Sequence, residues 1–303
     1  EYDARELPGY DTLDKLSTPE KNTEFEGEIL PSNGGEVYFR EDLALSPQKA
    51  YLWKGVTGES EDAYGKVVIT KEYAAGEEMV VHPGETLVVD FGQNCAAVPA
   101  FEFMAKEGTQ LNCRPSEILN DGNGAKSRGM DGPEGSCHRL NLRTPDTGML
   151  LDYTFADHKD YTTYRPHRTF YGYRFVSADQ EVRIRSIQSI PVSSITQQME
   201  TGSITTGNKL VNQLISNTLW GQRSNYLSVP TDCPQRDERM GWLNDLTVRM
   251  EMEQVFAVEM NVVSHGQAAM LERTFKENAE AVYQTLLTAM TKNYANEKEA
   301  QKP

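Results

Sequence analysis

The chain has 303 residues, 38% of them hydrophobic and 25% charged, a balance typical of a folded globular protein. This length is enough for two or three domains with separate hydrophobic cores. The net charge of -15 argues against nucleic acid as a partner, because binding to phosphates needs a basic surface. No apolar run approaches the roughly 20 residues of a membrane-spanning helix, so no membrane span is expected.

The chain begins with Glu1-Tyr2-Asp3, without an initiator methionine or a signal peptide. We interpret it as a processed or trimmed piece, so its compartment cannot be read from the sequence. The sequence contains no phosphate loop, dinucleotide fingerprint or H-E-x-x-H motif, and we expect neither cofactor nor metal. The four cysteines lack the spacing of a metal site, and buried free thiols are expected, with one disulfide as the alternative. These cysteines are Cys95, Cys113, Cys137 and Cys233.

Residues 1–84 are polar and rich in turn residues, as at Pro8-Gly9 and Ser32-Asn33-Gly34-Gly35. We predict that they form the end of an amino-terminal β-domain and a linker. Residues 85–195 have the alternating pattern of half-buried strands, for example at Phe101 and Phe103. We predict an antiparallel two-sheet β-sandwich here, with a turn at Phe91-Gly92-Gln93-Asn94 and a surface loop over 120–135.

After Pro191 the period changes to that of a helix. Val211, Leu214, Ile215, Thr218 and Leu219 fall on one helical face, and Thr205 or Thr206 is predicted as the cap. Two prolines predict a loop over 226–236, and helical patterning resumes near residue 246. Residues 196–303 are therefore predicted to form a helical domain. The chain is thus expected to contain β-structure in its first part and helices in its second.

The segment from Thr231 to Asp245 carries four carboxylates, two arginines and a tryptophan within a short stretch. Carboxylates accept hydrogen bonds from sugar hydroxyls, aromatic faces cover the C–H patches of sugars, and arginines fix carboxylates by pairing. The segment therefore suggests a sugar site. The alternative is a solvated charged run ahead of a helix, with Trp242 as a core residue and Asp232 closing a turn before Pro234.

The run Asp-Cys-Pro-Gln-Arg-Asp-Glu-Arg-x-Gly-Trp from Asp232 to Trp242 resembles the signature of glycoside hydrolase family 78, the bacterial α-L-rhamnosidases. The preceding segment, 219–231, is similar to the lead-in of these enzymes. Segments 90–94 and 171–176 resemble strands of their β-sandwich, and residues 1–5 resemble the end of their amino-terminal domain. The resemblance implies a multidomain chain: an antiparallel β-sandwich followed by the first part of an (α/α)6 six-hairpin toroid.

The resemblance also implies an inverting hydrolase that removes terminal α-L-rhamnose from a glycoside or polysaccharide, with Glu238 as the general acid. The residues expected to bind substrate are Asp232, Arg236, Asp237, Trp242 and Asp245. On charge grounds, Arg236 and Arg239 are also expected to position carboxylates. Asp237 competes with Glu238 for the acid role, but adjacent side chains point in different directions and the family favours Glu238.

An inverting enzyme also needs a carboxylate base, about 6.5–9.5 Å from the acid. The base is expected outside this chain, because Glu251, Glu253, Glu259 and Glu272 are read as exposed helix residues. Asn244 and Leu246 replace small residues of the family pattern. These changes keep open a second hypothesis, a carbohydrate-binding protein of the same architecture that has lost catalysis. A third, another enzyme on a related toroid, is disfavoured by the unbroken motif.

The remaining candidates have simpler explanations. His138, His158 and His167 are read as satisfied or exposed histidines rather than a metal trio. The tyrosines between residues 161 and 173 are read as sheet packing rather than a carbohydrate-binding face. The oligomeric state is not encoded in any motif, with a homodimer as one option, and a bacterial periplasmic or extracellular setting rests on family analogy alone.

Overall fold

The structure is a computed structural model, which describes residues 2–3, 36–122, 130–140, 151–156, 160–236 and 238–241. The chain forms two compact units. Among the described residues, the first contains residues 2–3, those between 39 and 192, and those of the short segment 233–238. The second contains residues 36–38, 193–232 and 239–241. Among the described helices, none combines the length and the apolar character that crossing a membrane requires.

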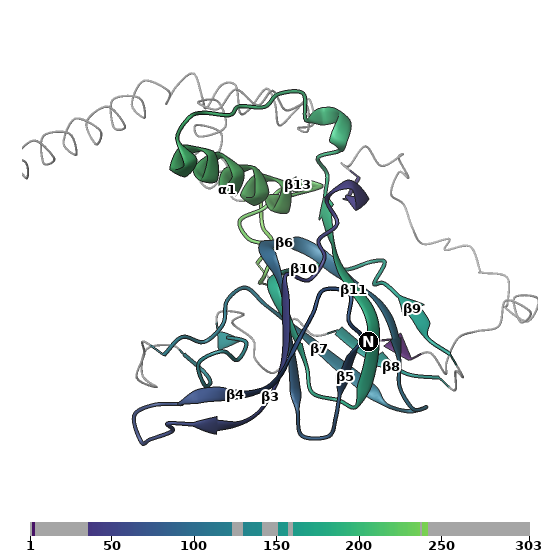
Figure 1. Cartoon of the computed structure of the whole chain (residues 1–303). Coiled ribbons are helices and arrows are strands. Elements are labelled where there is room, and N and C mark those ends of the chain that lie inside the picture. The colour runs from purple at the N-terminus through teal and green to yellow at the C-terminus, as the bar shows by residue number, and fades with distance from the viewer. Residues whose placement is uncertain are drawn as a thin grey trace, which may run out of the picture. The chain divides into compact units, whose positions relative to one another are not determined.

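The first unit is built on one eleven-stranded sheet that folds over into two layers (Figure 1). Its strands are β1 (Tyr2–Asp3), β2 (Tyr38–Phe39), β3 (Lys49–Thr57), β4 (Lys66–Tyr73), β5 (Met79–Val81), β6 (Thr86–Met104), β7 (Gln110–Ser116), β8 (Leu151–Thr154), β9 (Thr162–Tyr164), β10 (Tyr171–Ala178) and β11 (Val182–Ser193). A short 3-10 helix, η3 (Glu41–Leu43), follows β2.

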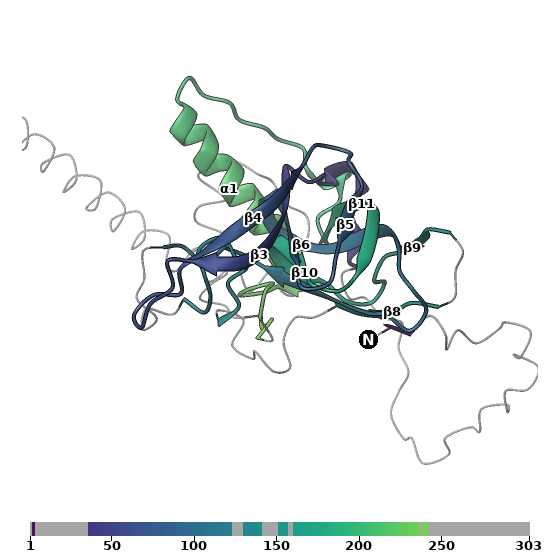
Figure 2. The same ribbon diagram turned by 60° about the horizontal axis from the view of Figure 1, so that its bottom comes forward.

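Strand β6 is 19 residues long and belongs to both layers. Its first half pairs with β3 and β10, and β10 leads on through β7 and β8 to β1. Its second half pairs with β11 and β9, and β11 also pairs with β5. Figures 1 and 2 show β6 and β11 as long strands lying side by side. The pairings are antiparallel except for the parallel pair β1–β8, so the predicted antiparallel β-sandwich is confirmed.

Aromatic side chains join the two layers. Phe103 from the second half of β6 is fully buried, and its ring meets those of Tyr153 on β8 and Phe155 edge to face. The centroids lie 4.8 Å and 4.7 Å apart. Each such ring stabilises the fold by roughly 1.5–3 kcal/mol through burial, and favourable edge-to-face pairing adds to this. The alternation read at Phe101 and Phe103 therefore marks the core face of β6, as predicted.

The turn predicted at Phe91–Asn94 is wrong, because these residues form a bulge within β6. Tyr173 of β10 pairs with Cys95 and Phe175 pairs with Asp90, which leaves one residue of β10, Arg174, opposite the bulge. Gly92 has a φ of +78°, a left-handed conformation that glycine adopts without strain. The glycine after this buried run marks a bulge rather than the end of a strand.

Strands β3, β4 and β5 precede residue 85, within the range expected to be an amino-terminal domain end and linker. They hydrogen-bond to one another or to β6 and β11, and so they join the sandwich sheet. The side chains at alternate positions of β3 explain this, because Ala50 and Leu52 are buried. The predicted boundaries between domains stay predictions.

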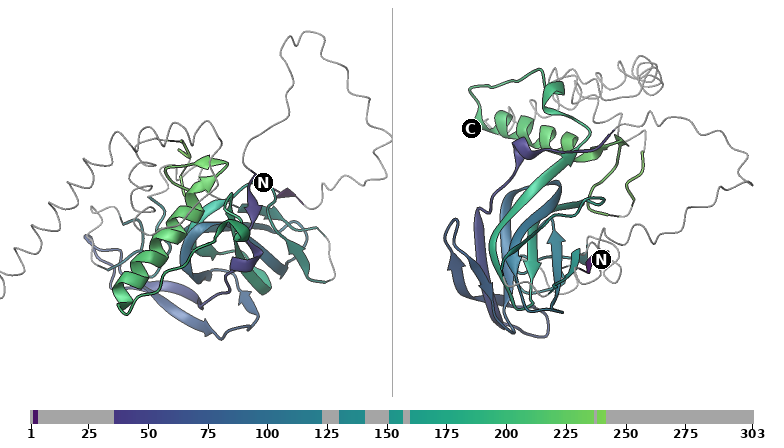
Figure 3. Two further views of the ribbon diagram at one scale, coloured as in Figure 1. Left: turned by 90° about the horizontal axis from the view of Figure 1, so that it is seen from above. Right: turned by 90° about the vertical axis from the view of Figure 1, so that its right-hand side faces the viewer.

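The second unit contains the 3-10 helix η6 (Gln197–Met199) and the helix α1 (Lys209–Asn225), seen as a continuous rod in Figure 3. The helix confirms the periodicity read between Val211 and Leu219. Its cap is Asn208, whose side-chain oxygen accepts from the main-chain N–H groups of Leu210 and Val211. The prediction of Thr205 or Thr206 as the cap is wrong. Thr206 instead donates its hydroxyl to the Asn212 side chain, 2.9 Å away.

All four cysteines are buried and free, as predicted. The described part of the 120–135 loop is tied down by Asn120, which is 2% exposed. Its side-chain nitrogen donates to Asp131 and Ser136, and its side-chain oxygen accepts from the Asp131 main chain. The predicted surface loop therefore has a buried polar anchor at its base.

Candidate active site

A tight hairpin connects α1 to the motif. Strands β12 (Tyr226–Leu227) and β13 (Val229–Pro230) pair around Ser228, which has a φ of 66°. The main chain of Thr231 then donates to the carbonyl of Asn225, 2.7 Å away, which ties the hairpin exit to the helix end. The predicted loop over 226–236 therefore begins as a two-strand hairpin and continues without regular structure from Thr231. This arrangement fixes the start of the motif against the end of α1.

The motif forms a loop that closes on itself. The Asp232 main-chain N–H donates to the carbonyl of Met240 at 3.1 Å, and the Met240 N–H donates to the Asp232 side chain at 2.8 Å. Arg239, just before Met240, has a φ of 44°, a conformation rare for residues other than glycine. Asp232 thus closes the loop to Met240. Its expected contact with rhamnose stays a prediction.

The central charged pair of the loop joins Arg236 and Glu238. The Arg236 Nη2 lies 3.1 Å from the Glu238 Oε2, and the two side chains are 27% and 29% exposed. The buried thiol of Cys233 donates to the same carboxylate oxygen over 3.9 Å, a weak contact. The loop therefore presents one carboxylate that is held from two sides and still reaches solvent.

The loop segment also rests on the sandwich. Gln235 lies directly over Gly172 of β10, so close that a side chain at Gly172 would collide with the Gln235 main chain. Gly172 was not among the residues predicted at the site. The available signal was a glycine inside a strand pattern, which often marks the close approach of another backbone.

Several expected site residues lie outside the described residues. These are Asp237, Trp242 and Asp245, together with Asn244 and Leu246, where the motif departs from the family pattern. The glutamates expected on helix surfaces, Glu251, Glu253, Glu259 and Glu272, also lie outside them. The structure thus brings Arg236 and Glu238 together and places Asp232 at the closure of their loop.

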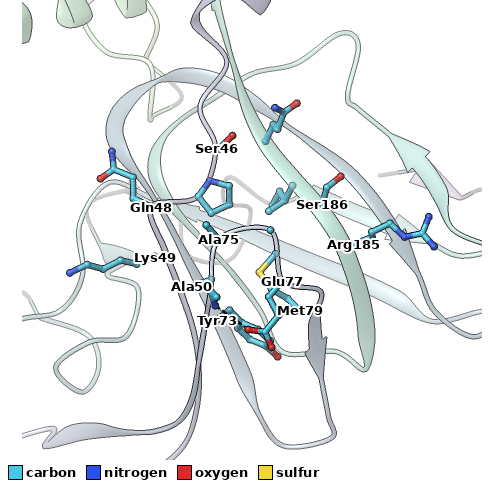
Figure 4. A pocket seen from close by; sticks show the side chains of 15 residues that line it. Ser46, Gln48, Lys49, Ala50, Tyr73, Ala75, Glu77, Met79, Arg185 and Ser186 are labelled. Carbon is cyan, nitrogen blue, oxygen red and sulfur yellow. Dashed lines mark hydrogen bonds between the residues drawn. The ribbon is translucent and has the colours of Figure 1, made fainter.

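A cavity of about 620 Å³ opens elsewhere on the sandwich, between β11 and the connection from β4 to β5 (Figure 4). Tyr73, Glu77, Met79 and Gln188 are among the residues lining it, and Figure 4 shows Lys49 and Arg185 extending away from it on opposite sides. The Tyr73 hydroxyl is already engaged by both the N–H and the carbonyl of Val80. Of the residues expected at the sugar site, the three that the structure describes, Asp232, Arg236 and Glu238, do not line this cavity.

Comparison with known proteins identifies both halves of the chain. Residues 80–193 match the bacterial alpha-L-rhamnosidase concanavalin-like domain. Residues 199–292 match the bacterial alpha-L-rhamnosidase 6 hairpin glycosidase domain. The β-sandwich followed by the start of a six-hairpin toroid, predicted from the sequence, is thereby confirmed, and this pair of domains defines a glycoside hydrolase architecture.

Individual relatives agree with the domain matches. An alpha-L-rhamnosidase of Streptomyces avermitilis is 33% identical over 205 residues, covering 65% of this chain and 18% of the relative. One of Formosa agariphila is 31% identical over 172 residues, covering 56% of this chain and 17% of the relative. The chain belongs to the bacterial α-L-rhamnosidases of glycoside hydrolase family 78.

Among solved structures, the S. avermitilis alpha-L-rhamnosidase complexed with L-rhamnose is 26% identical, with a TM-score of 0.48. The alignment covers 72% of this chain and 17% of that one. The chain thus spans less than a fifth of the length of these curated relatives.

Proposed function

We propose that the protein acts as a glycoside hydrolase that removes terminal α-L-rhamnose from a glycoside or polysaccharide. The half-buried Arg236–Glu238 pair, within the motif of a family of rhamnosidases, is the observation that carries this proposal. Glu238 reaches solvent at 29% side-chain exposure, so a sugar can approach it, while its neighbours limit its rotation.

In the proposed reaction, Glu238 gives its proton to the glycosidic oxygen as the bond to the sugar breaks. A general acid at this position lowers the barrier because the leaving group departs as a neutral alcohol. Arg236 lies beside the carboxylate that Glu238 becomes after it loses the proton, and a guanidinium stabilises such a carboxylate. Asp232, Asp237, Trp242 and Asp245 are proposed to bind the rhamnose ring and its hydroxyls.

The proposed stereochemical course is inversion. A water molecule attacks the anomeric carbon from the face opposite the leaving group, and a carboxylate base outside this chain takes the proton from that water. A single displacement on an α-L-rhamnoside yields β-L-rhamnose as the first product. The reaction needs no redox or group-transfer cofactor, since two carboxyl groups and water balance it.

Hydrolysis of p-nitrophenyl α-L-rhamnoside by the full-length protein tests the proposal, with the released sugar followed by proton NMR from the first turnovers. The proposal expects nitrophenol release and an initial excess of the β anomer. An initial excess of the α anomer would contradict inversion while leaving the hydrolase intact. Rhamnose binding without hydrolysis would support the alternative, a carbohydrate-binding protein that has lost catalysis, which the changes at Asn244 and Leu246 keep open.

A further inference from the structure

The contact between Gly172 and Gln235 is closer than any side chain at position 172 would allow. A Cβ at Gly172 would lie 2.6 Å from the main-chain nitrogen of Gln235, 2.8 Å from its Cα and 2.8 Å from its Cβ. Real Cβ atoms essentially never approach other atoms within 3.0 Å. Because the nearest atom belongs to the main chain, no rotation of a flexible side chain relieves the collision.

The backbone conformation of Gly172 does not explain the glycine. Gly92, on the neighbouring strand, has a φ of +78°, whereas Gly172 lies outside the positive range that disfavours other residues. Gly172 pairs in register with Ala96 inside the sheet. A glycine in the interior of a strand weakens that strand, because it gains no side-chain packing and loses more chain entropy. The space occupied by Gln235 is the feature that requires glycine here.

Strand β10 is the rigid partner in this contact. The residues on either side of Gly172 point into the core, where Tyr171 is 7% exposed and Tyr173 is fully buried. The ring of Tyr173 packs edge to face on Phe91 across the strand pair. An added methyl group at position 172 therefore cannot push β10 into a core that is already packed. The motif segment above it is what has to move.

We propose that Gly172 is a positioning residue, which lets the motif segment lie directly on β10 and thereby sets the place of Glu238. The inference rests on the proposed function and adds a role for the sandwich in it. Gln235 is adjacent to Arg236, whose guanidinium contacts Glu238 at 3.1 Å, so a displacement at Gln235 is passed on to the acid. A misplacement of about 1 Å at a reacting group costs on the order of 100-fold in rate.

The test compares Gly172→Ala with Gly207→Ala in the full-length protein. Gly207 is exposed and has no positive φ, and a Cβ added there would have no neighbouring atom within 4 Å. It is therefore a matched control for the added methyl group. Two substrates are used, 4-methoxyphenyl and 2,4-dinitrophenyl α-L-rhamnoside. The dinitrophenolate leaves with little help from an acid, whereas the methoxyphenolate needs a proton.

The expected result is a fall in kcat of about 10- to 100-fold on the 4-methoxyphenyl substrate for Gly172→Ala, and a fall several times smaller on the dinitrophenyl substrate. The melting temperature of Gly172→Ala should stay close to that of the wild type, because alanine is tolerated in a strand. Gly207→Ala should match the wild type on both substrates. A misplaced acid predicts this dependence on the leaving group, while loss of folded enzyme lowers both rates equally.

The other outcomes are distinct. Equal losses on both substrates, or a Gly172→Ala protein that does not fold, would make Gly172 a structural residue and overturn the inference. An active wild type with an unaffected Gly172→Ala would also overturn it, without touching the proposed function. A wild type that is inert on both substrates would overturn the proposed function and this inference together.

Discussion

The guanidinium of Arg236 and the carboxylate of Glu238 form an ion pair of 3.1 Å, in which both side chains stay about one quarter exposed. Only one residue, Asp237, separates Arg236 from Glu238 in the sequence, so the pair is local to the motif loop. Because partly exposed ion pairs contribute little to stability, about 0–1 kcal/mol, its value lies in orienting the carboxylate rather than in holding the fold.

Replacement of Arg236 should therefore affect rate more than stability. We expect Arg236→Gln to lower kcat/KM on p-nitrophenyl α-L-rhamnoside by on the order of 10- to 100-fold, since the carboxylate loses the group that orients it. The melting temperature should change little. Arg185→Gln, which removes an exposed pair with Glu102 on the sandwich, serves as the control and should keep wild-type activity. A large loss of stability without a loss of rate per folded molecule would contradict this role.

The bulge in β6 should depend on the pair between Asp90 and Arg174. The Arg174 side chain donates to both carboxylate oxygens, at 2.7 Å and 2.8 Å, and Gly92 donates its N–H to the same carboxylate. The Asp90 side chain is 11% exposed, so removing its partner leaves a largely buried charge. We expect Arg174→Ala to lower the free energy of unfolding by roughly 1–3 kcal/mol.

Urea unfolding followed by circular dichroism measures this effect. Arg183→Ala is the matched control, because the pair of Arg183 with Glu78 is 51% and 30% exposed and should contribute about 0–1 kcal/mol. If both variants lost the same small amount, the Asp90 carboxylate would not be the anchor of the bulge.

The helix cap gives a third prediction. Asn208→Ala should destabilise the unit containing α1 by about 1 kcal/mol, because two main-chain N–H groups lose their acceptor. Thr205→Ala should have little effect, as Thr205 makes no contact of this kind among the described hydrogen bonds. Thermal unfolding of the two variants compares the caps directly. A larger loss for Thr205→Ala would restore the cap that the sequence alone suggested.

The buried thiols should make the free energy of unfolding decrease as the pH rises in the alkaline range. Burial raises the pKa of Cys95 and of Cys137 from 9.0 to about 12. In the unfolded chain these thiols ionise near their ordinary pKa, while the folded protein keeps them protonated. Their contribution to stability is therefore complete below about pH 9 and is lost as the pH rises toward 12.

Two measurements check the thiols. Iodoacetamide at pH 8 should label neither Cys95 nor Cys137 in the native protein and should label both in urea, as read by peptide mass spectrometry. The urea concentration at the unfolding midpoint should decrease when the pH is raised from 8 to 9.5. This decrease should be smaller in Cys95→Ala. Rapid native labelling of either thiol would show that its site is open to solvent.

The sequence predicted those parts of the structure that repeat locally. The alternation at Phe101 and Phe103 marks buried positions of β6, and the spacing from Val211 to Leu219 marks α1, because each pattern follows from the geometry of one element. The motif at Asp232–Trp242 led to the family for a different reason, since its residue order is distinctive. The roles given to its residues remain predictions.

Other features depend on contacts between distant parts of the chain. Nothing near Phe91 shows that Arg174, more than eighty residues later, faces the bulge that replaces the expected turn. Likewise, only the fold brings Gln235 onto Gly172. The cap at Asn208 was not predicted because threonine and asparagine are both common N-cap residues, and the choice between neighbouring candidates depends on where the first turn begins.

The role of Glu238 as the general acid is tested most directly by the rate of Glu238→Gln on 4-methoxyphenyl and 2,4-dinitrophenyl α-L-rhamnoside. Glutamine has nearly the same shape and no acidic proton. If Glu238 is the acid, the rate of Glu238→Gln falls by about 100- to 10,000-fold on the methoxyphenyl substrate and by much less on the dinitrophenyl substrate. Equal rates of wild type and Glu238→Gln on the methoxyphenyl substrate would contradict this role.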